Sequence, residues 1–316
     1  MKKILSFILC IVLALGMIGC GGTDSVQSSD ESSLEHTASW LVETSGEPSF
    51  GSIGGDWLVF ALERNDMLPD DWGEKYYSSL VKELQSCGGV LSDKQYTEYS
   101  RPVLTLAALD KNPRDIEGFD ILAPLGDFDM TNFVGVIGTS YALLALDAGA
   151  YEVPQCPEGA YQASRDEYVA HILECEAAGG GWGFASNNAT ADTSAMVLQA
   201  LAKYQSDENV KAAIDRAITW LSQQQDDKAG FDDSCETVAQ AIIAFVELGI
   251  SLDDERFVKN GRGLDDRLMD FALDNGAFSH VEGGPENQMA TEQAFLALTA
   301  LNCLEKGETL YAVKAA

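Results

Sequence analysis

The chain has 316 residues, and its 50 Asp and Glu against 20 Lys and Arg give a formal net charge of −30 at pH 7. So acidic a protein repels nucleic-acid phosphates and anionic lipid head groups, which excludes nucleic-acid binding and leaves a lipid anchor as its one expected membrane contact. No apolar run after residue 20 is long enough to cross a bilayer.

Residues 1–19 are predicted to be a lipoprotein signal peptide. Lys2 and Lys3 precede an apolar run, Ile4 to Ile18, that is too short for a retained membrane span. The run ends Met17-Ile18-Gly19-Cys20, which resembles the site where bacterial lipoproteins are cleaved and lipidated. We expect a lipid on Cys20 and an extracytoplasmic, membrane-anchored location. An ordinary secretory signal with Cys20 left free is the alternative.

Residues 20–33 are rich in Ser, Asp and Glu and are expected to form a disordered tether before a single domain at 34–316. The cysteines beyond the tether are dispersed, odd in number and without CxxC spacing, so they favour small buried hydrophobes over a disulfide scaffold. These are Cys87, Cys156, Cys175, Cys235 and Cys303.

Apolar stretches that end in an Ala-Leu-like pair recur about every 47 residues along the domain. They are apolar on most faces and therefore predict helices buried on most faces. The pairs are Ala61-Leu62, Ala108-Leu109, Ala145-Leu146, Ala200-Leu201, Ala244-Phe245 and Ala297-Leu298.

Amphipathic segments alternate with these apolar stretches and predict outer helices. The clearest is Glu208 to Gln225, whose apolar residues recur at three- and four-residue spacings. The others are Leu34 to Thr44, Glu74 to Cys87, Ala163 to Ala177, Asp265 to Asp274 and, more weakly, Asp115 to Leu122. Strand signals are nearly absent. The fold class is therefore all-α, with about six hairpins of inner and outer helices in a closed ring or an open solenoid.

The connecting turns carry a family resemblance. The segment from Ile218 to Phe231 runs from a helix through Trp-Leu and glutamines to a Gly-Phe pair. This pattern resembles the repeat of terpene cyclases and protein prenyltransferase β-subunits, which implies an α/α toroid. The same fold occurs in vitamin B12 carriers and thioester domains, so the resemblance indicates a shape more than a function.

The glycine-aromatic turn itself recurs, as Gly181-Trp182, Gly230-Phe231 and Gly276 to Phe278. Glycine permits backbone angles that end a helix, and the aromatic side chain can pack beneath the next one. We interpret these turns mainly as structural joints.

The acid run of the cyclases is incomplete here. That family protonates an alkene with an Asp-x-Asp-Asp-Thr motif, and Asp192-Thr193 is the nearest match, with Ala191 where an aspartate is needed. Met130 interrupts the second candidate, Asp127 to Thr131. Both are interpreted as carboxylates at helix starts, which the helix dipole favours.

The resemblance to prenyltransferases implies a zinc site, of which the sequence keeps a partial pair, Asp233 and Cys235. The family's histidine position aligns with Ala290, and only a displaced His280 or Glu292 could complete the site. Likewise, Gly284 replaces the cysteine of thioester domains. We therefore expect no cofactor, with zinc as the alternative.

The loops that enter the inner helices combine aromatic residues with carboxylates, which suits a ligand with an apolar body and polar or cationic groups. The candidate ligand-binding residues are Trp182, Phe184, Asp192, Asp232, Asp233, Glu236, His280, Glu286 and Glu292. The sequence favours a non-catalytic module that binds a small molecule, peptide or glycan. A divergent prenyltransferase or terpene cyclase-like enzyme is the alternative.

Overall fold

The computed structural model describes residues 27–184 and 188–313. It confirms the all-α class, since the described residues form helices, turns and isolated bridges without a β-strand. The predicted signal peptide and Cys20 lie outside these residues. In the described part of the chain, every helix is too short or too polar to span a bilayer.

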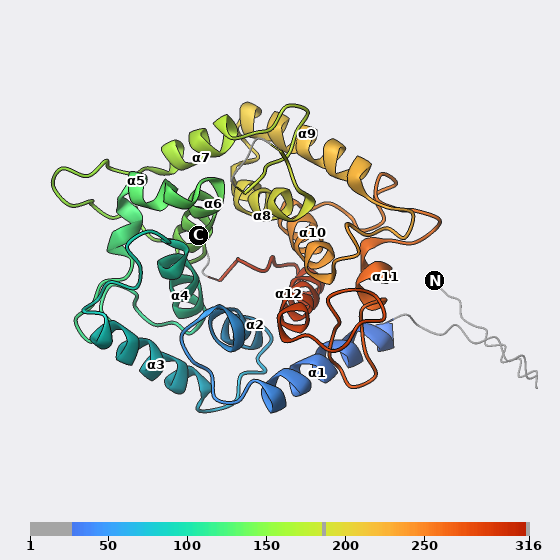
Figure 1. Cartoon of the computed structure of the whole chain (residues 1–316), viewed down its shortest axis with the longest axis horizontal. Coiled ribbons are helices and arrows are strands. Elements are labelled where there is room, and N and C mark those ends of the chain that lie inside the picture. The colour runs from blue at the N-terminus through green and yellow to red at the C-terminus, as the bar shows by residue number, and fades with distance from the viewer. Residues whose placement is uncertain (1–26, 185–187, 314–316) are drawn as a thin grey trace, which may run out of the picture.

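Six helices of the described chain form an inner ring (Figure 1). Each contacts the next in chain order, and α12 contacts α2, so the ring closes. The inner helices are α2 (Trp57–Arg64), α4 (Thr97–Ala108), α6 (Val136–Ala148), α8 (Ala191–Leu201), α10 (Cys235–Leu248) and α12 (Gln288–Glu305). Each coincides with one predicted apolar stretch.

The alternate helices lie outside the ring, each packed on an inner helix (Figure 1). They are α1 (Gln27–Thr44), α3 (Trp72–Ser86), α5 (Phe128–Thr131), α7 (Arg165–Glu174), α9 (Glu208–Gln224) and α11 (Leu264–Met269). The predicted apolar stripe of α9, from Val210 to Leu221, is buried. Short helical turns complete the chain at Ser52–Asp56, Ala123–Gly126, Asn132–Val134 and Ala202–Tyr204.

Helix α1 begins at Gln27, within the segment that the sequence assigned to the tether, so residues 27–33 are helical in the structure.

The segment Asp115 to Leu122 is a turn rather than an outer helix, because Glu117 and Gly118 have φ of 51° and 90°. Ile116 and Phe119 pair through their backbones instead. The short helix α5 takes this outer position.

Inner helices α2 and α12 run parallel: Gly54, before α2, contacts Glu292 near the start of α12, and Asn65, after α2, contacts Asn302 near the end of α12. With an outer helix between each pair of inner ones, the inner helices begin at one end of the ring. Side chains cap several of these starts: Thr190 accepts from the N–H of Thr193, Ser234 from that of Thr237 and Asn287 from that of Ala290. We call this the amino end of the ring and the opposite one the carboxyl end. The amino end collects the helix-dipole ends that favour negative charge.

Candidate functional site: the amino end of the ring

Three of the predicted candidates, Asp192, Glu236 and Glu292, lie at the amino end, on α8, α10 and α12. Asp192 and Glu236 occupy the first turns of neighbouring helices. Burial, together with the charge of Glu236, raises the pKa of Asp192. The two carboxylates therefore lie close enough to repel each other at the edge of the ring.

Glu292 lies deeper, with 3% of its surface exposed. Its Oε1 accepts hydrogen bonds from the N–H of Gly54 at 2.8 Å and from Gln288 Nε2 at 3.0 Å. Burial raises the pKa of Glu292 to about 7, despite these hydrogen bonds. Like Asp192, it has no salt-bridge partner among the described residues.

The sequence analysis missed a fourth carboxylate at this end, Asp56. It is fully buried, accepts from Tyr76 Oη at 2.8 Å and pairs with Arg101 Nε at 3.1 Å. Burial raises the pKa of Asp56 to about 6, even though Arg101 opposes the shift. Its position in the sequence could have identified it, because Asp56 directly precedes the apolar helix α2 and the other carboxylates lie near the starts of their own inner helices.

His280 joins this cluster through Glu236. Its Nδ1 lies 2.7 Å from Glu236 Oε2, and the imidazole is more than half exposed. The backbone holds the loop in place, because the N–H of Cys235 donates to the carbonyl of His280 at 3.0 Å. His280, a candidate ligand-binding residue, therefore contacts a carboxylate at the start of α10.

Asp233 and Cys235 do not fit a zinc ion. Asp233 Oδ1 accepts from Arg267 Nη2 at 2.6 Å, and the same guanidinium binds Asp270 and Glu282. Cys235 is buried, with its Sγ 3.8 Å from the carbonyl of Ala290, and burial raises the pKa of its thiol. No group of three or more metal-ligating side chains occurs in the described ranges.

The glycine-aromatic turns pack as structural joints. Trp182 is fully buried; its indole N–H donates to the carbonyl of Ile172 at 2.8 Å and its backbone N–H to Ser194 Oγ at 2.9 Å. Phe231 and Phe278 are also buried. Gly180 lies so close to α9 that an added Cβ would stand 2.7 Å from the carbonyl of Arg216. Trp182, which was predicted to bind a ligand, therefore supports the fold instead.

The remaining candidates lie on the surface. Phe184 is 60% exposed on the loop before α8. Asp232 is exposed in a left-handed conformation with φ of 51°, and Glu286 is exposed and accepts from Asn275 Nδ2 at 2.9 Å. Among the described contacts, neither acidic side chain joins the cluster of Asp192, Glu236 and Glu292.

The inner helices carry a layer of larger side chains one turn after Asp192 and Glu236. Its members precede the Ala of each Ala-Leu-like pair by four residues, and we call them the floor: Trp57, Leu104, Tyr141, Met196, Gln240 and Gln293. The rings of Trp57 and Tyr141, on helices that are not neighbours, lie 5.7 Å apart between centroids. Tyr141, Met196 and Gln293 remain partly exposed, so solvent reaches this layer.

Exposed apolar side chains surround the cluster on the loops. Ile53 precedes α2, Phe133 precedes α6, Phe184 precedes α8 and Met289 lies in the first turn of α12. The loops of Phe133 and Phe184 adjoin, since a Cβ on Gly135 would lie 3.4 Å from the carbonyl of Phe184. The amino end therefore combines buried and partly buried carboxylates, a floor that includes Trp57 and Tyr141, and an apolar rim.

No protein-family model matches the chain, and no curated protein matches it. Among solved structures, a protein from Actinoplanes is similar in fold, with a TM-score of 0.52 and 13% sequence identity. The match covers 86% of this chain and 98% of that protein. At this identity the likeness shows the fold alone.

Proposed function

We propose that this chain is a non-catalytic binding protein that takes a ligand with an apolar body and a cationic group at the amino end of the ring. The observation that carries the proposal is the set of carboxylates Asp192, Glu236 and Glu292, which face one end of the ring without a Lys or Arg partner among the described residues. Glu292 is buried, Asp192 and Glu236 are partly buried, and Glu236 contacts the imidazole of His280. Carboxylates that lose water without gaining a Lys or Arg partner are destabilised, and a cation brought by a ligand would relieve that cost.

The aromatic side chains support the same ligand class. Trp57 and Tyr141 lie below the carboxylates. Burial raises the pKa of Tyr141 to about 12, and the negative charge of Asp192 contributes to this rise. Aromatic faces attract organic cations and cover their apolar parts. An aliphatic or aromatic amine therefore fits better than a metal ion or a neutral sugar.

Phenethylamine and its neutral analogue 2-phenylethanol provide a matched pair of probes for calorimetry. We expect saturable binding of the amine and at least tenfold weaker binding of the alcohol. Asp192→Asn and Glu236→Gln should each weaken amine binding about tenfold, or about 1.4 kcal/mol. Asp232→Asn and Glu286→Gln are matched controls that should leave it unchanged. Equal binding of both probes, or equal effects of all four variants, contradicts the proposal.

The resemblance to terpene cyclases and prenyltransferases, and the signal that ends at Cys20, extend the proposal to a toroid lipoprotein on the extracytoplasmic face of a bacterial membrane. Cys20→Ser should abolish labelling by a radioactive fatty acid and move the protein from the detergent phase to the aqueous phase. A wild type that takes up no label would leave an ordinary secretory signal as the better interpretation, and labelling that persists in Cys20→Ser would place the lipid on another residue.

One observation favours a second candidate, an acid-type cyclase. Burial raises the pKa of Asp192, and an acid that stays protonated in the ring could pass its proton to an alkene carbon and regain one when the carbocation loses a proton. Incubation with squalene tests this. A cyclised product that disappears with Asp192→Asn, but persists with Asp233→Ala, would establish the cyclase and replace the binding proposal.

A further inference from the structure

The last described residues return into the ring. Helix α12 ends at Glu305, Gly307 turns the chain with φ of +77°, and residues Glu308 to Val313 then cross the carboxyl end toward α6 (Figure 1). We call this segment the strap. It lies at the opposite end of the ring from the acidic cluster.

Two charged side chains from different inner helices hold the strap by its backbone. Arg64, at the end of α2, donates to the carbonyls of Leu310 and Thr309 at 3.0 and 3.1 Å and also pairs with Glu308 at 3.1 Å. Glu247, on α10, accepts from the N–H of Tyr311 at 3.2 Å. Such contacts recognise an extended backbone and not a particular sequence.

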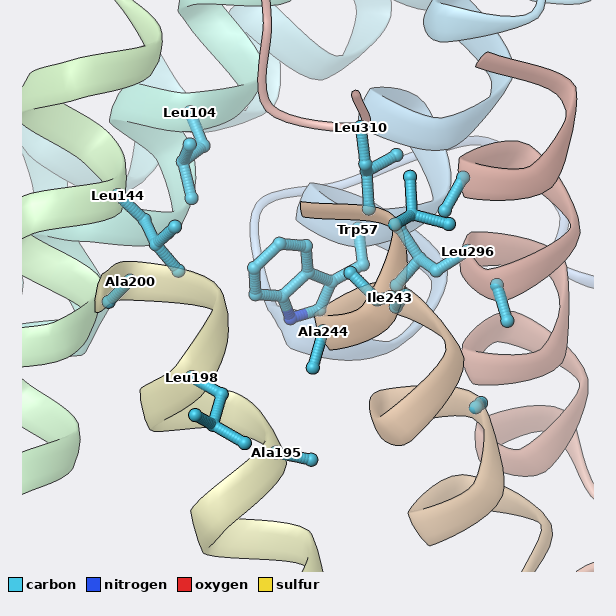
Figure 2. Close-up of a cluster of buried hydrophobic side chains, with 14 of the residues drawn as sticks. Trp57, Leu104, Leu144, Ala195, Leu198, Ala200, Ile243, Ala244, Leu296 and Leu310 are labelled. Atoms are coloured by element: carbon cyan, nitrogen blue, oxygen red, sulfur yellow. The ribbon is translucent and has the colours of Figure 1, made fainter. Parts of the chain in front are cut away.

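Two side chains of the strap supply the apolar contact. Leu310 is fully buried and belongs to the same hydrophobic cluster as Trp57 (Figure 2). Tyr311 stacks on Phe60 with 6.0 Å between centroids, and its hydroxyl donates to Gln199 Oε1 at 2.9 Å. A leucine followed by an aromatic residue is therefore the pattern that the strap presents.

The strap leaves part of its binding region unfilled. A cavity of about 580 Å³ lies beside it, with Leu144, Ala148 and Ala200 on the ring side and Ala312 and Val313 on the strap side. Gln199 and Lys203 add polar groups to the wall. The ring therefore offers more room at this end than the strap occupies.

We infer that the carboxyl end of the ring is a binding socket for an extended peptide with a Leu-aromatic pair, and that the strap is its intramolecular occupant. When the strap leaves, the backbone contacts of Arg64 and Glu247 and the pockets for Leu310 and Tyr311 become free for a peptide of this chemistry. Because the strap is tethered, it competes at high effective concentration and keeps the socket closed in the intact chain. The inference does not depend on the ligand proposed for the amino end.

A full-length Leu310→Asp variant tests the socket, because a buried aspartate should expel the strap from its apolar site. The probe is a fluorescent heptapeptide, Gly-Glu-Thr-Leu-Tyr-Ala-Val, which copies residues 307–313. We expect saturable binding to the variant and at least tenfold weaker binding to the wild type, whose own strap competes. A peptide with Ala in place of Tyr should bind the variant at least tenfold more weakly. A folded variant that does not bind the peptide overturns the inference.

Hydrogen exchange of the wild-type protein covers the case in which the variant fails to fold. If the strap is a separable occupant, the amides of Leu310 and Tyr311 should exchange at least tenfold faster than the slowest amides of α10 and α12. Exchange of all these amides at one common rate would show that the strap opens only with the whole domain, which also overturns the inference.

Discussion

Glu292 Oε1 accepts a hydrogen bond of 2.8 Å from the backbone N–H of Gly54, which joins the last inner helix to the loop before the first one across 238 residues of sequence. The same carboxyl oxygen accepts from Gln288 on its own helix. This carboxylate therefore helps to close the ring and also contributes to the proposed ligand site. Its dual position makes it an informative residue for the protein's pH dependence.

We predict that stability falls as the pH rises from about 4.5 to about 7, and that Glu292 contributes much of the fall. Its pKa is raised from 4.5 to about 7 in the folded state, so the folded protein holds a proton that the unfolded chain has released. At about 1.4 kcal/mol per pKa unit, the loss is on the order of 3 kcal/mol.

Urea unfolding at pH 5 and pH 8 measures this loss. Glu292→Gln keeps an oxygen for the N–H of Gly54 but removes the titration, so it should reduce the difference between the two pH values and be the more stable protein at pH 8. An unchanged difference in the variant would show that other groups cause the pH dependence.

The two aromatic residues of one glycine-aromatic turn should respond differently to substitution. Trp182→Phe removes the indole N–H from the buried carbonyl of Ile172 and should destabilise the fold by about 1–3 kcal/mol. Phe184→Ala changes an exposed side chain and should stay within about 0.5 kcal/mol of the wild type. Chemical denaturation measures both, and calorimetry with phenethylamine should show weaker binding for Phe184→Ala. Equal stability losses would contradict the division of roles within this turn.

Asp233 is expected to act as a partner of Arg267 and not as a zinc ligand. The guanidinium of Arg267 is buried, and Asp270 and Glu282 still surround it when Asp233 is removed. Asp233→Asn should therefore cost less than about 1 kcal/mol, because the carboxylate is half exposed. Arg267→Met should cost about 2 kcal/mol, because it removes the buried hydrogen bonds of the guanidinium and leaves Asp233 without a cation, while Lys228 and Arg262 still pair with Glu282 and Asp270.

Elemental analysis of the purified protein tests whether Asp233 and Cys235 bind zinc. We expect less than stoichiometric zinc in the wild type and no change in metal content with Cys235→Ser. Stoichiometric zinc that is lost with Cys235→Ser would show that the ligands rearrange and would restore the metal-site interpretation.

The residue pattern was enough to predict the six inner helices and the buried stripe of the clearest outer helix. The apolar stretch around Ala244-Phe245 and the single stripe of α9 were sufficient, because helix periodicity and burial are local properties of the residue pattern. The same reasoning failed at Asp115 to Leu122, where apolar residues at helical spacing are buried by a turn with positive φ at Glu117 and Gly118. Periodicity shows that residues are buried but does not exclude a folded-back loop.

Which candidate residues contact one another depends on how the helices pack. Asp192 and Glu236 lie close together because α8 and α10 run parallel, whereas Asp233 and Cys235, neighbours in sequence, diverge toward the surface and the core. Asp56 was missed because the sequence does not show that Tyr76 and Arg101 surround it. The return of Leu310 and Tyr311 into the ring was equally hidden, since a contact between Tyr311 and Phe60 depends on ring closure and not on local propensity.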